Sequence, residues 1–237
     1  MTQVDVVIPA YNAANFLGEA LDSVLVQDAL VGKIFVVDDG SSDGTAALAI
    51  SFASSFAKTN GVPVEVIQLP GNRGAAAARN AGVARCTADF VAFLDADDRW
   101  LPGKLEAQVA ALTNSQQSAL AICGARAFAD PGLPEAERLA LLAQQPAEME
   151  GWMASALLAR RPLFEMAGGF AEDLRLGEGI DWFNRARPFG HVAVPEVLVE
   201  RRMHRNNTTR LADEQRRDYL LAAHRHLARQ RTAGGGG

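Results

Sequence analysis

Short apolar runs alternate with segments of helical periodicity over the first hundred residues. Four runs have the length and composition of buried strands, at residues 4–8, 34–37, 64–69 and 90–94. Three segments between them repeat apolar or alanine positions at helical spacing, at residues 16–25, 45–58 and 74–85. Strands and helices in alternation predict an α/β fold with a mainly parallel central sheet and helices on both faces.

The second half of the chain is less regular, and the alternation fades after Cys123. Three helices are predicted there, at residues 131–145, 178–187 and 210–231. Two strands are predicted, at residues 154–159 and 191–199, and Pro195 interrupts the second of them. No internal repeat and no linker rich in Gly, Pro or Ser divides the chain, so one domain is expected, followed by a disordered tail at residues 234–237.

Polar side chains follow three of the predicted strands directly. Tyr11 and Asn12 come after the first strand, Asp38 to Ser41 after the second, and Asp95 to Asp98 after the fourth. Parallel sheets bind their ligands at the carboxyl ends of the strands. The sequence therefore predicts a binding site at this edge of the sheet.

The C-terminal end differs in charge from the rest of the chain. The formal net charge of -5 gives no general attraction to nucleic acid or to anionic lipid. From Arg201 onward, however, nine arginines accompany three acidic residues, with Leu211, Leu220, Leu221 and Leu227 among them. This basic segment could lie on a membrane surface or pack on the domain as an amphipathic helix.

The cysteines and the hydropathy of the chain indicate in which cellular compartment the protein is expected. Cys86 and Cys123 lie beside apolar runs, which predicts buried free thiols in a reducing environment. The strand at residues 4–8 leaves no room for a signal peptide. No apolar stretch approaches the ~20 residues that span a bilayer. We expect a cytoplasmic protein, with peripheral contact at the inner face of the membrane through the basic end as a further option.

The acidic turn after the fourth strand has two interpretations. Asp95, Asp97 and Asp98 repel one another, and removing them from water is costly unless a cation or solvent compensates. Hard oxygen ligands suit Mg²⁺ or Mn²⁺. Water molecules and substrate phosphates usually complete the coordination shell of these ions. The alternative is a solvated turn that caps a helix beginning near Pro102. On these residues alone, both interpretations stay open.

A second acidic loop joins the strand at residues 34–37 to the following helix. Ser42 or Asp43 could cap that helix, whereas Asp39 at the strand end is better placed to bind a base or a ribose. The loop contains no G-x-G-x-x-G sequence, and the chain has no Walker phosphate loop. These absences argue against a dinucleotide cofactor.

The sequence resembles the inverting GT-A glycosyltransferases of family 2. Four strings follow the order and spacing of the family's motifs over residues 4–108, namely VVIPAYNAANFLGEALDSVLVQ, VVDDGSSDGT, NRGAAAARNAG and DFVAFLDADDRWLPGKLEAQ. Three later strings extend the similarity to about residue 210, namely ALLARRPLFEMAGGF, GEGIDWFNRAR and RRMHRNNTTR. The resemblance implies a Rossmann-like GT-A fold and transfer of a sugar, with inversion, from a nucleoside-diphosphate sugar to a hydroxyl acceptor. A UDP-sugar is the favoured donor, and Mn²⁺ or Mg²⁺ the cofactor.

The resemblance also implies roles for the donor-side residues. Pro9 and Tyr11 would line the nucleobase slot, with Tyr11 stacked on the ring, and Asp39 would hydrogen-bond the base. Arg79 would reach the base or the diphosphate, and Asp95 would face the ribose or the donor sugar. Residues 1–125 would form the donor half, 126–210 a smaller acceptor-side half, and 211–233 a basic C-terminal helix.

Two residues match the family's metal region. Asp97 would ligate the metal that bridges the diphosphate, whose charge grows as the glycosidic bond breaks. His204 matches a position near the metal and the diphosphate. Without the resemblance, a histidine among arginines would be read as an exposed bystander.

The general base is where the sequence departs from its family. Inverting transfer needs a base that deprotonates the acceptor hydroxyl. The family usually has two acidic residues in succession here. Glu178 matches the first of them, but Gly179 stands where the family has the aspartate that acts as base. Asp181 lies close to the same face of the predicted helix. Either Glu178 or Asp181 could be the base, with Asp181 favoured beside Trp182; alternatively, both are structural and the chain is weakly active.

Two aromatic and glycine features have a structural and a functional interpretation. Gly168-Gly169-Phe170 could be a helix C-cap with a buried aromatic ring or a close approach of backbone to the donor sugar. Trp152 and Trp182 could stack on a sugar, but core packing is expected for at least one of them.

Two alternatives to a hexosyltransferase of EC class 2.4 stay open. A nucleotide-sugar-binding protein would keep Asp39 and Asp97 but lack a base, and Gly179 favours this alternative. A nucleotidyltransferase would also need a sheet with metal-binding acids. It usually has a glycine-rich basic loop after its first strand, and Pro9-Ala10-Tyr11-Asn12 lacks that feature.

Overall fold

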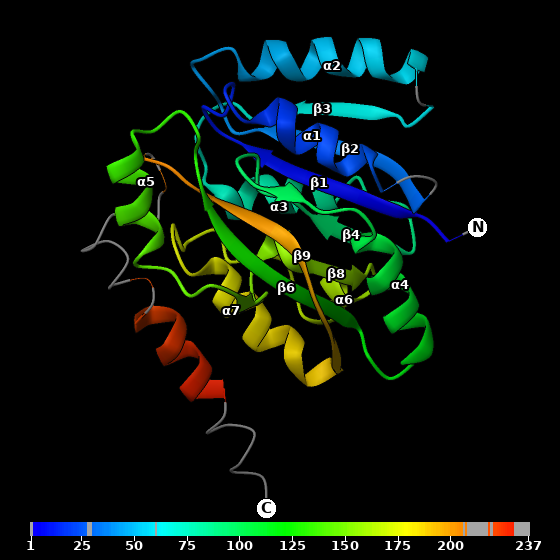
Figure 1. Ribbon diagram of the computed structural model, residues 1–237. Helices are drawn as coiled ribbons and strands as arrows, with labels where there is room; N and C mark the ends of the chain where they lie inside the picture. The colour runs from blue at the N-terminus through cyan, green and yellow to red at the C-terminus, as the bar shows by residue number, and fades with distance from the viewer. Residues whose placement is uncertain are drawn as a thin grey trace, which may run out of the picture.

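The computed structural model describes residues 2–27, 30–59, 61–205, 207, 218 and 220–229. The elements up to residue 114 are, in order, β1 (Val4–Ala10), α1 (Leu17–Leu25), β2 (Val31–Asp38), α2 (Thr45–Thr59), β3 (Val64–Gln68), α3 (Ala75–Val83), β4 (Phe90–Phe93), β5 (Arg99–Trp100) and α4 (Lys104–Asn114). The later elements are β6 (Leu120–Ala129), α5 (Glu135–Leu142), β7 (Met149–Glu150), a 3-10 turn (Ala154–Ala156), β8 (Leu157–Arg160), α6 (Leu163–Met166), α7 (Glu178–Ala186), a second 3-10 turn (Arg187–Phe189) and β9 (His191–Met203). Residues 220–229 form the C-terminal helix, red and unlabelled in Figure 1.

The first half confirms the predicted alternation of strands and helices, but the second half corrects it in several places. No strand is predicted at residues 120–129, where β6 lies, because small residues interrupt its apolar pattern. The strand predicted at 154–159 is a 3-10 turn followed by β8. The strand predicted to break at Pro195 continues to Met203, and α5 is shorter than the predicted 131–145.

The far C-terminal predictions are only partly covered by the structure. Residue 218 and residues 220–229 are helical, in agreement with the helix predicted at 210–231. The rest of that prediction and the expected tail at 234–237 lie outside the described residues. Among the described residues, no helix is long and apolar enough to cross a membrane.

One nine-stranded sheet runs through the chain in the order β3-β2-β1-β4-β8-β6-β9-β5, with β7 paired to β6. The first four strands pair in parallel, as do β6 and β9, whereas β8 is antiparallel to both of its neighbours. The sheet is mixed and mostly parallel, as predicted. The division at residue 125 stays a prediction about function, because β6 crosses that residue and both halves share the sheet.

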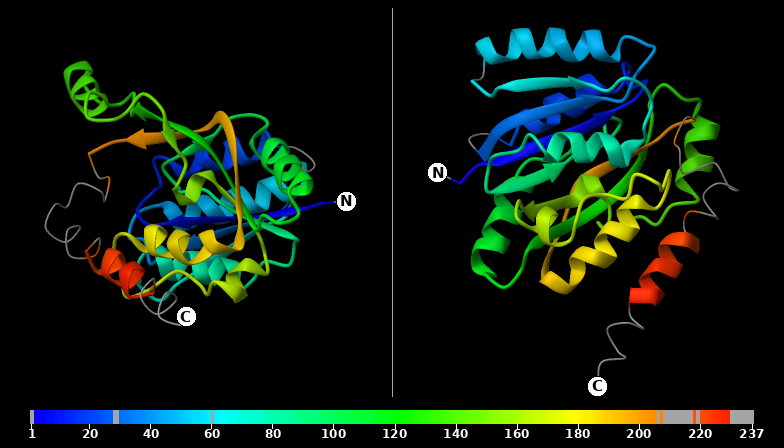
Figure 2. Two further views of the ribbon diagram at one scale, coloured as in Figure 1. Left: turned by 90° about the horizontal axis from the view of Figure 1, so that it is seen from below. Right: turned by 180° about the vertical axis from the view of Figure 1, so that it is seen from behind.

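Helices cover both faces of this sheet (Figures 1 and 2). Alternate residues of β1 point to opposite faces, so Val6 and Ile8 join the core that contains α1 and α4, and Val7 joins the core that contains α3 and α7. β1 is buried at every residue. The two cores explain why the strand runs are apolar without alternation.

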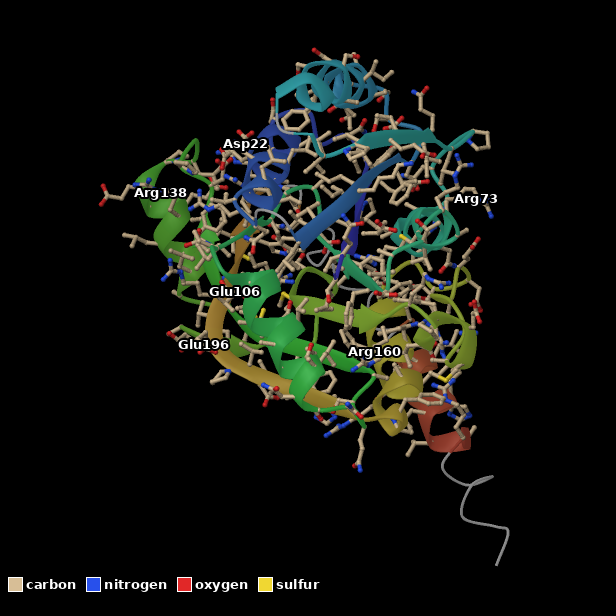
Figure 3. All side chains as sticks on the ribbon, turned by 90° about the vertical axis from the view of Figure 1, so that its right-hand side faces the viewer. Asp22, Arg73, Glu106, Arg138, Arg160 and Glu196 are labelled. Carbon is tan, nitrogen blue, oxygen red and sulfur yellow. The ribbon has the colours of Figure 1, made fainter. Side chains whose placement is uncertain are left out.

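A bulge lets β9 pass through Pro195. Cys123 of β6 is opposite Val194, but the next residue, Gly124, is opposite Val197, so β9 contains two extra residues there. Proline has no N–H to donate and is tolerated at such bulges. Figure 3 labels Glu196, which is exposed and is one of the two extra residues of this bulge.

Both cysteines are free and buried, which confirms the prediction from sequence. Burial raises the pKa of the Cys86 thiol to about 12. A thiol with so high a pKa is almost entirely protonated at neutral pH, which makes it a poor nucleophile.

Lys104 is a buried cation at the start of α4. Its ammonium lies 2.7 Å from Gln108 Oε1 and 4.1 Å from the centroid of the Trp100 ring. Burial lowers the pKa of Lys104 from 10.5 to about 8. Between these two values the unfolded chain binds more protons than the folded protein, so the free energy of unfolding should rise with pH across this window.

We expect Lys104→Met to remove this pH dependence. Between pH 8 and pH 10, the stability of the wild type should rise relative to that of the variant by up to about 1.4 kcal/mol per pH unit. Urea unfolding at a series of pH values measures this difference. Lys33→Met, at a partly exposed lysine, is the control and should keep the wild-type slope. Equal slopes in the wild type and Lys104→Met would contradict the expectation.

Candidate active site

The acidic turn after β4 meets a histidine from the end of β9. His204 Nε2 lies 2.9 Å from Asp97 Oδ2. The histidine is buried and its ring lies 4.7 Å from that of Phe16, centroid to centroid, whereas the Asp97 side chain is 31% exposed. The fold thus brings together the two predicted metal residues, which are 107 positions apart in the chain.

Arg202 holds the acidic turn in place. Its Nε donates to the carbonyl oxygen of Asp97 at 2.9 Å, and its backbone N–H donates to Asp98 Oδ1 at 3.0 Å. Its Nη2 lies 2.6 Å from Glu19 Oε2 on α1. Arg202 was not predicted from the sequence as a site residue, although it stands two residues before His204 in the string RRMHR.

The three aspartates of the turn have different surroundings. Asp98 is buried and accepts hydrogen bonds from Ser155 Oγ and from the Arg202 backbone. Burial, reinforced by the charges of Asp97 and Asp95, raises the pKa of Asp98 well above its ordinary value. The same Ser155 hydroxyl accepts the backbone N–H of Asp95. Asp98 is therefore a structural residue of the turn, and the other two carboxylates point elsewhere.

Arg79 connects Asp95 to α7. Its Nη2 lies 2.6 Å from Asp95 Oδ1, and its Nη1 lies 2.7 Å from Glu178 Oε1. The arginine is almost completely buried; burial opposes its charge, but the two carboxylates outweigh this effect and raise its pKa. Its Nε atom is buried and has no hydrogen-bond partner among the described residues.

Asp39, at the end of β2, organises the loop before α3. Its two carboxylate oxygens accept the backbone N–H groups of Arg73 at 2.8 Å and Gly74 at 2.7 Å. Its side chain is 2% exposed. Tyr11, after the neighbouring strand β1, is 48% exposed, and Pro9 is buried. The nucleobase residues predicted from sequence thus lie at the carboxyl ends of adjacent parallel strands.

The loops after β1 and β2 are joined by hydrogen bonds. Ser41 Oγ accepts the backbone N–H of Asn12, whose side-chain oxygen accepts the backbone N–H of Ser42. Asp43 Oδ1 accepts the N–H of Thr45, the first residue of α2. Of the two predicted capping residues, Asp43 makes this contact.

Glu178 and Asp181 on α7 have different partners. Glu178 pairs with Arg79, which also binds Asp95 just after β4. Asp181 is 2% exposed, and its oxygens lie 2.9 Å from Arg185 Nε and 2.9 Å from Arg229 Nη2. A Cβ at Gly179 would meet no atom within 4 Å. Glu178 is therefore linked through Arg79 to Asp95, whereas Asp181 is enclosed by two arginines.

Trp182 is a core residue, which corrects its interpretation as an acceptor platform beside Asp181. It is fully buried and stacked against Phe164 and Phe170. Its indole N–H donates to the carbonyl oxygen of Gly168. Gly168 has a φ of 76° just after α6, the conformation of a helix C-cap.

Comparison with known proteins decides the family. The sequence family described as Glycosyl transferase family 2 matches residues 5–150. The chain belongs to this family. It is a glycosyltransferase of EC class 2.4, which excludes the nucleotidyltransferase alternative.

One curated relative and two solved structures illustrate the similarity. An uncharacterized glycosyltransferase of Rickettsia typhi is 29% identical over 91% of this chain and 69% of that protein. A mannosyltransferase of Pyrobaculum calidifontis in complex with GDP-Man and Mn²⁺ has a TM-score of 0.71 and 20% identity, covering 94% of this chain and 64% of its own. S. aureus TarS 1-349 in complex with UDP-GlcNAc has a TM-score of 0.69 and 18% identity, covering 89% and 61%. The chain thus spans less than two thirds of either solved structure, and the likeness to them shows the GT-A fold.

The contact between Asp97 and His204 offers two side chains of types that bind divalent cations. Among the described residues, no three His, Cys, Asp or Glu side chains gather closely enough to hold a metal ion. Asp97 and His204 supply one carboxylate and one imidazole in direct contact. Mg²⁺ and similar ions are commonly bound by one or two protein ligands together with substrate phosphates and water. The two residues therefore fit a divalent cation that arrives with a diphosphate.

Proposed function

We propose that this chain transfers a sugar, with inversion, from a nucleoside-diphosphate sugar to a hydroxyl acceptor in a reaction that depends on Mn²⁺ or Mg²⁺. The observation that carries the proposal is the pairing of Asp97 with His204 beside the bridge from Asp95 through Arg79 to Glu178. Asp97 and His204, which suit a cation, thus lie near the carboxyl ends of the strands, and Glu178 of α7 is linked to the same region through Arg79. This edge is where α/β sheets bind their ligands.

The cation would be held by Asp97 Oδ2 and His204 Nε2, and it would neutralise the charge that develops on the departing diphosphate. Arg202 keeps Asp97 in position through the main-chain carbonyl. Arg79 is already paired with two carboxylates, so its role is to orient Asp95 towards the donor and Glu178 towards the acceptor.

The nucleoside would lie over the ends of β1 and β2. Tyr11 is exposed and its ring can stack on a base, and the buried Pro9 lies two residues earlier in the chain. Asp39 is fixed by two main-chain N–H groups, and a carboxylate with two such bonds keeps lone pairs for an N–H group of the base. UDP is the favoured nucleotide, and the N–H of its uracil would meet Asp39.

Glu178 is the proposed general base in place of Asp181. Asp181 is buried and both of its carboxylate oxygens bind arginines. Glu178, by contrast, is linked through Arg79 to Asp95. The second candidate is a member of the family whose main function is to bind a nucleotide sugar and whose catalysis is impaired, which the glycine at the position of the family's base aspartate favours. Gly179→Asp separates the two functions, because an added carboxylate should raise turnover only if a base is missing.

A binding screen tests the donor site. Thermal unfolding would be followed with UDP-, GDP- and dTDP-sugars, each with and without Mn²⁺. We expect at least one donor to stabilise the fold modestly alone and much more with Mn²⁺, by roughly 2.7 kcal/mol at ~100 times its dissociation constant. An unchanged melting temperature across all nucleotides and metals would contradict the donor site.

We further propose that the C-terminal helix contacts anionic lipid at the inner face of the membrane. Leu220 is 65% exposed and Leu227, two turns later on the same face, is 52% exposed. These exposed leucines lie in a segment that carries nine arginines and three acidic residues from Arg201 onward, and basic segments with an apolar face are typical of helices that lie on a membrane surface.

Vesicle sedimentation tests this contact. We expect the wild type to bind vesicles containing anionic lipid at low salt, and Leu220→Ser/Leu227→Ser to bind them several-fold less. Neutral vesicles are the control. Equal sedimentation with and without anionic lipid would mean that the helix only covers the domain.

A further inference from the structure

The C-terminal helix packs along the segment that carries Glu178, as both views of Figure 2 and Figure 1 show. The contacting residues recur at helical spacing and share one face, namely Asp218, Ala222, Arg225 and Arg229. Ala222 is fully buried, whereas Leu220 and Leu227 on the other side are exposed. The helix therefore turns its polar face towards the domain.

Three sets of contacts fasten this face to residues 173–181. Asp218 Oδ2 accepts the backbone N–H groups of Arg175 at 2.9 Å and Leu176 at 3.0 Å. Arg225 pairs with Asp173 in an exposed ion pair. Arg229 Nη2 lies 2.9 Å from Asp181 Oδ1. The contacts thus span the loop before α7 and the first turn of that helix.

The contact at Asp181 differs from the others because it is buried. Asp181 accepts from Arg229 through one oxygen and from Arg185 through the other. Arg185 also donates to the carbonyl oxygens of Ala167 and Gly169, so this carboxylate connects three segments. Removing Arg229 would leave Arg185 as the one arginine on Asp181 among the ion pairs described, and the loss of a partner from a buried carboxylate is costly.

Glu178 lies within the stretch that these contacts fasten. It follows Gly177, whose φ is 78°, and the loop from residue 171 to 177 contains no regular helix or strand. On its other side, Glu178 is held by Arg79. The position of its carboxylate thus depends on the start of α7, which the C-terminal helix holds.

We infer that the C-terminal helix is a clasp that positions Glu178, with Asp181 as its buried anchor and Arg229 as the positioning residue. The catalytic part of this inference rests on the proposed function. Under this inference Asp181 binds the C-terminal helix and does not transfer a proton. The inference also explains why this buried carboxylate on α7 faces a basic terminal segment.

The test compares Arg229→Met with Arg225→Met. Arg229→Met should lower kcat by about 10- to 100-fold, since small misplacements of a reacting group have effects of this size. The KM for the donor and the affinity for the nucleoside diphosphate should stay near wild type. Arg225→Met removes only an exposed pair and should change kcat less than about threefold. Arg229→Lys should restore most of the activity.

Hydrogen exchange gives a readout that does not require transfer. In Arg229→Met, amide exchange should rise at least about tenfold in residues 173–183 and stay unchanged in α1. If no sugar is transferred by the wild type, the proposed function fails while this measurement still tests the clasp. Unchanged exchange in residues 173–183 would overturn the inference. So would a loss of donor affinity as large as the loss of kcat, or equal effects of the two methionine variants.

Discussion

Glu178→Gln is expected to reduce kcat by 10²- to 10⁴-fold, about 3 to 5 kcal/mol of barrier, and to leave donor binding nearly intact. Glutamine keeps an oxygen for Arg79, so the bridge to Asp95 can persist while the proton acceptor is lost. Steady-state kinetics give kcat, and calorimetric titration gives the affinity for the nucleoside diphosphate.

Asp181→Asn is the matched control for this substitution. Its amide oxygen can still accept one arginine, so we expect a moderate loss of kcat together with a lower melting temperature. If Glu178→Gln retains near-normal transfer, the base lies elsewhere. A larger loss of kcat in Asp181→Asn than in Glu178→Gln, at equal donor affinity, would return the role to Asp181.

Asp97→Asn is expected to abolish the contribution of the metal to nucleotide binding. Asp97 is partly exposed and in contact with His204, so it can share a cation with a diphosphate. In calorimetric titrations, Mn²⁺ should strengthen binding of the nucleoside diphosphate to the wild type by at least tenfold and leave its binding to Asp97→Asn unchanged.

Asp39→Ala is the contrasting variant. Asp39 holds the loop before α3 and lies at a different strand end, so its loss should weaken binding of the nucleoside with or without metal. The difference between the two variants is the informative result. If both lose the same metal-dependent share of the affinity, this division of roles is wrong.

The sequence predicted the first half of the fold well for a local reason. In β1 to β4 and the helices between them, apolar periodicity and the turn residues agree over short stretches. In β6, small residues such as Gly124 blur the pattern, because β9 approaches its backbone closely at the bulge. Pro195 likewise suggested an interruption that the bulge accommodates.

The sequence could predict those candidate site residues that lie within a single local motif. Asp39, Asp95 and Asp97 could be predicted as site residues because they lie just after strands of the parallel sheet. The supporting residues Arg202 and Ser155 were not found, since their hydrogen bonds cross more than 50 residues of sequence. These contacts depend on how β9 and β8 join the sheet, which no local pattern specifies.

The partners of Asp181 were also beyond reach from sequence. Helical spacing placed Glu178 and Asp181 close to one face of the predicted helix, and the sequence favoured Asp181 as the base because it lies beside Trp182. The structure separates them through Arg79 on α3 and Arg229 on the C-terminal helix, which lie far from α7 in the chain.

Release of nucleoside diphosphate from a sugar donor is the most direct test of the central claim that the chain is a metal-dependent glycosyltransferase. The wild type would be incubated with UDP-, GDP- and dTDP-sugars and a mixture of hydroxyl acceptors, with Mn²⁺ or with a chelator, alongside Asp97→Asn. We expect Mn²⁺-dependent release from at least one donor, lost in the chelator and in the variant. Tight donor binding without any release by the wild type would contradict the claim.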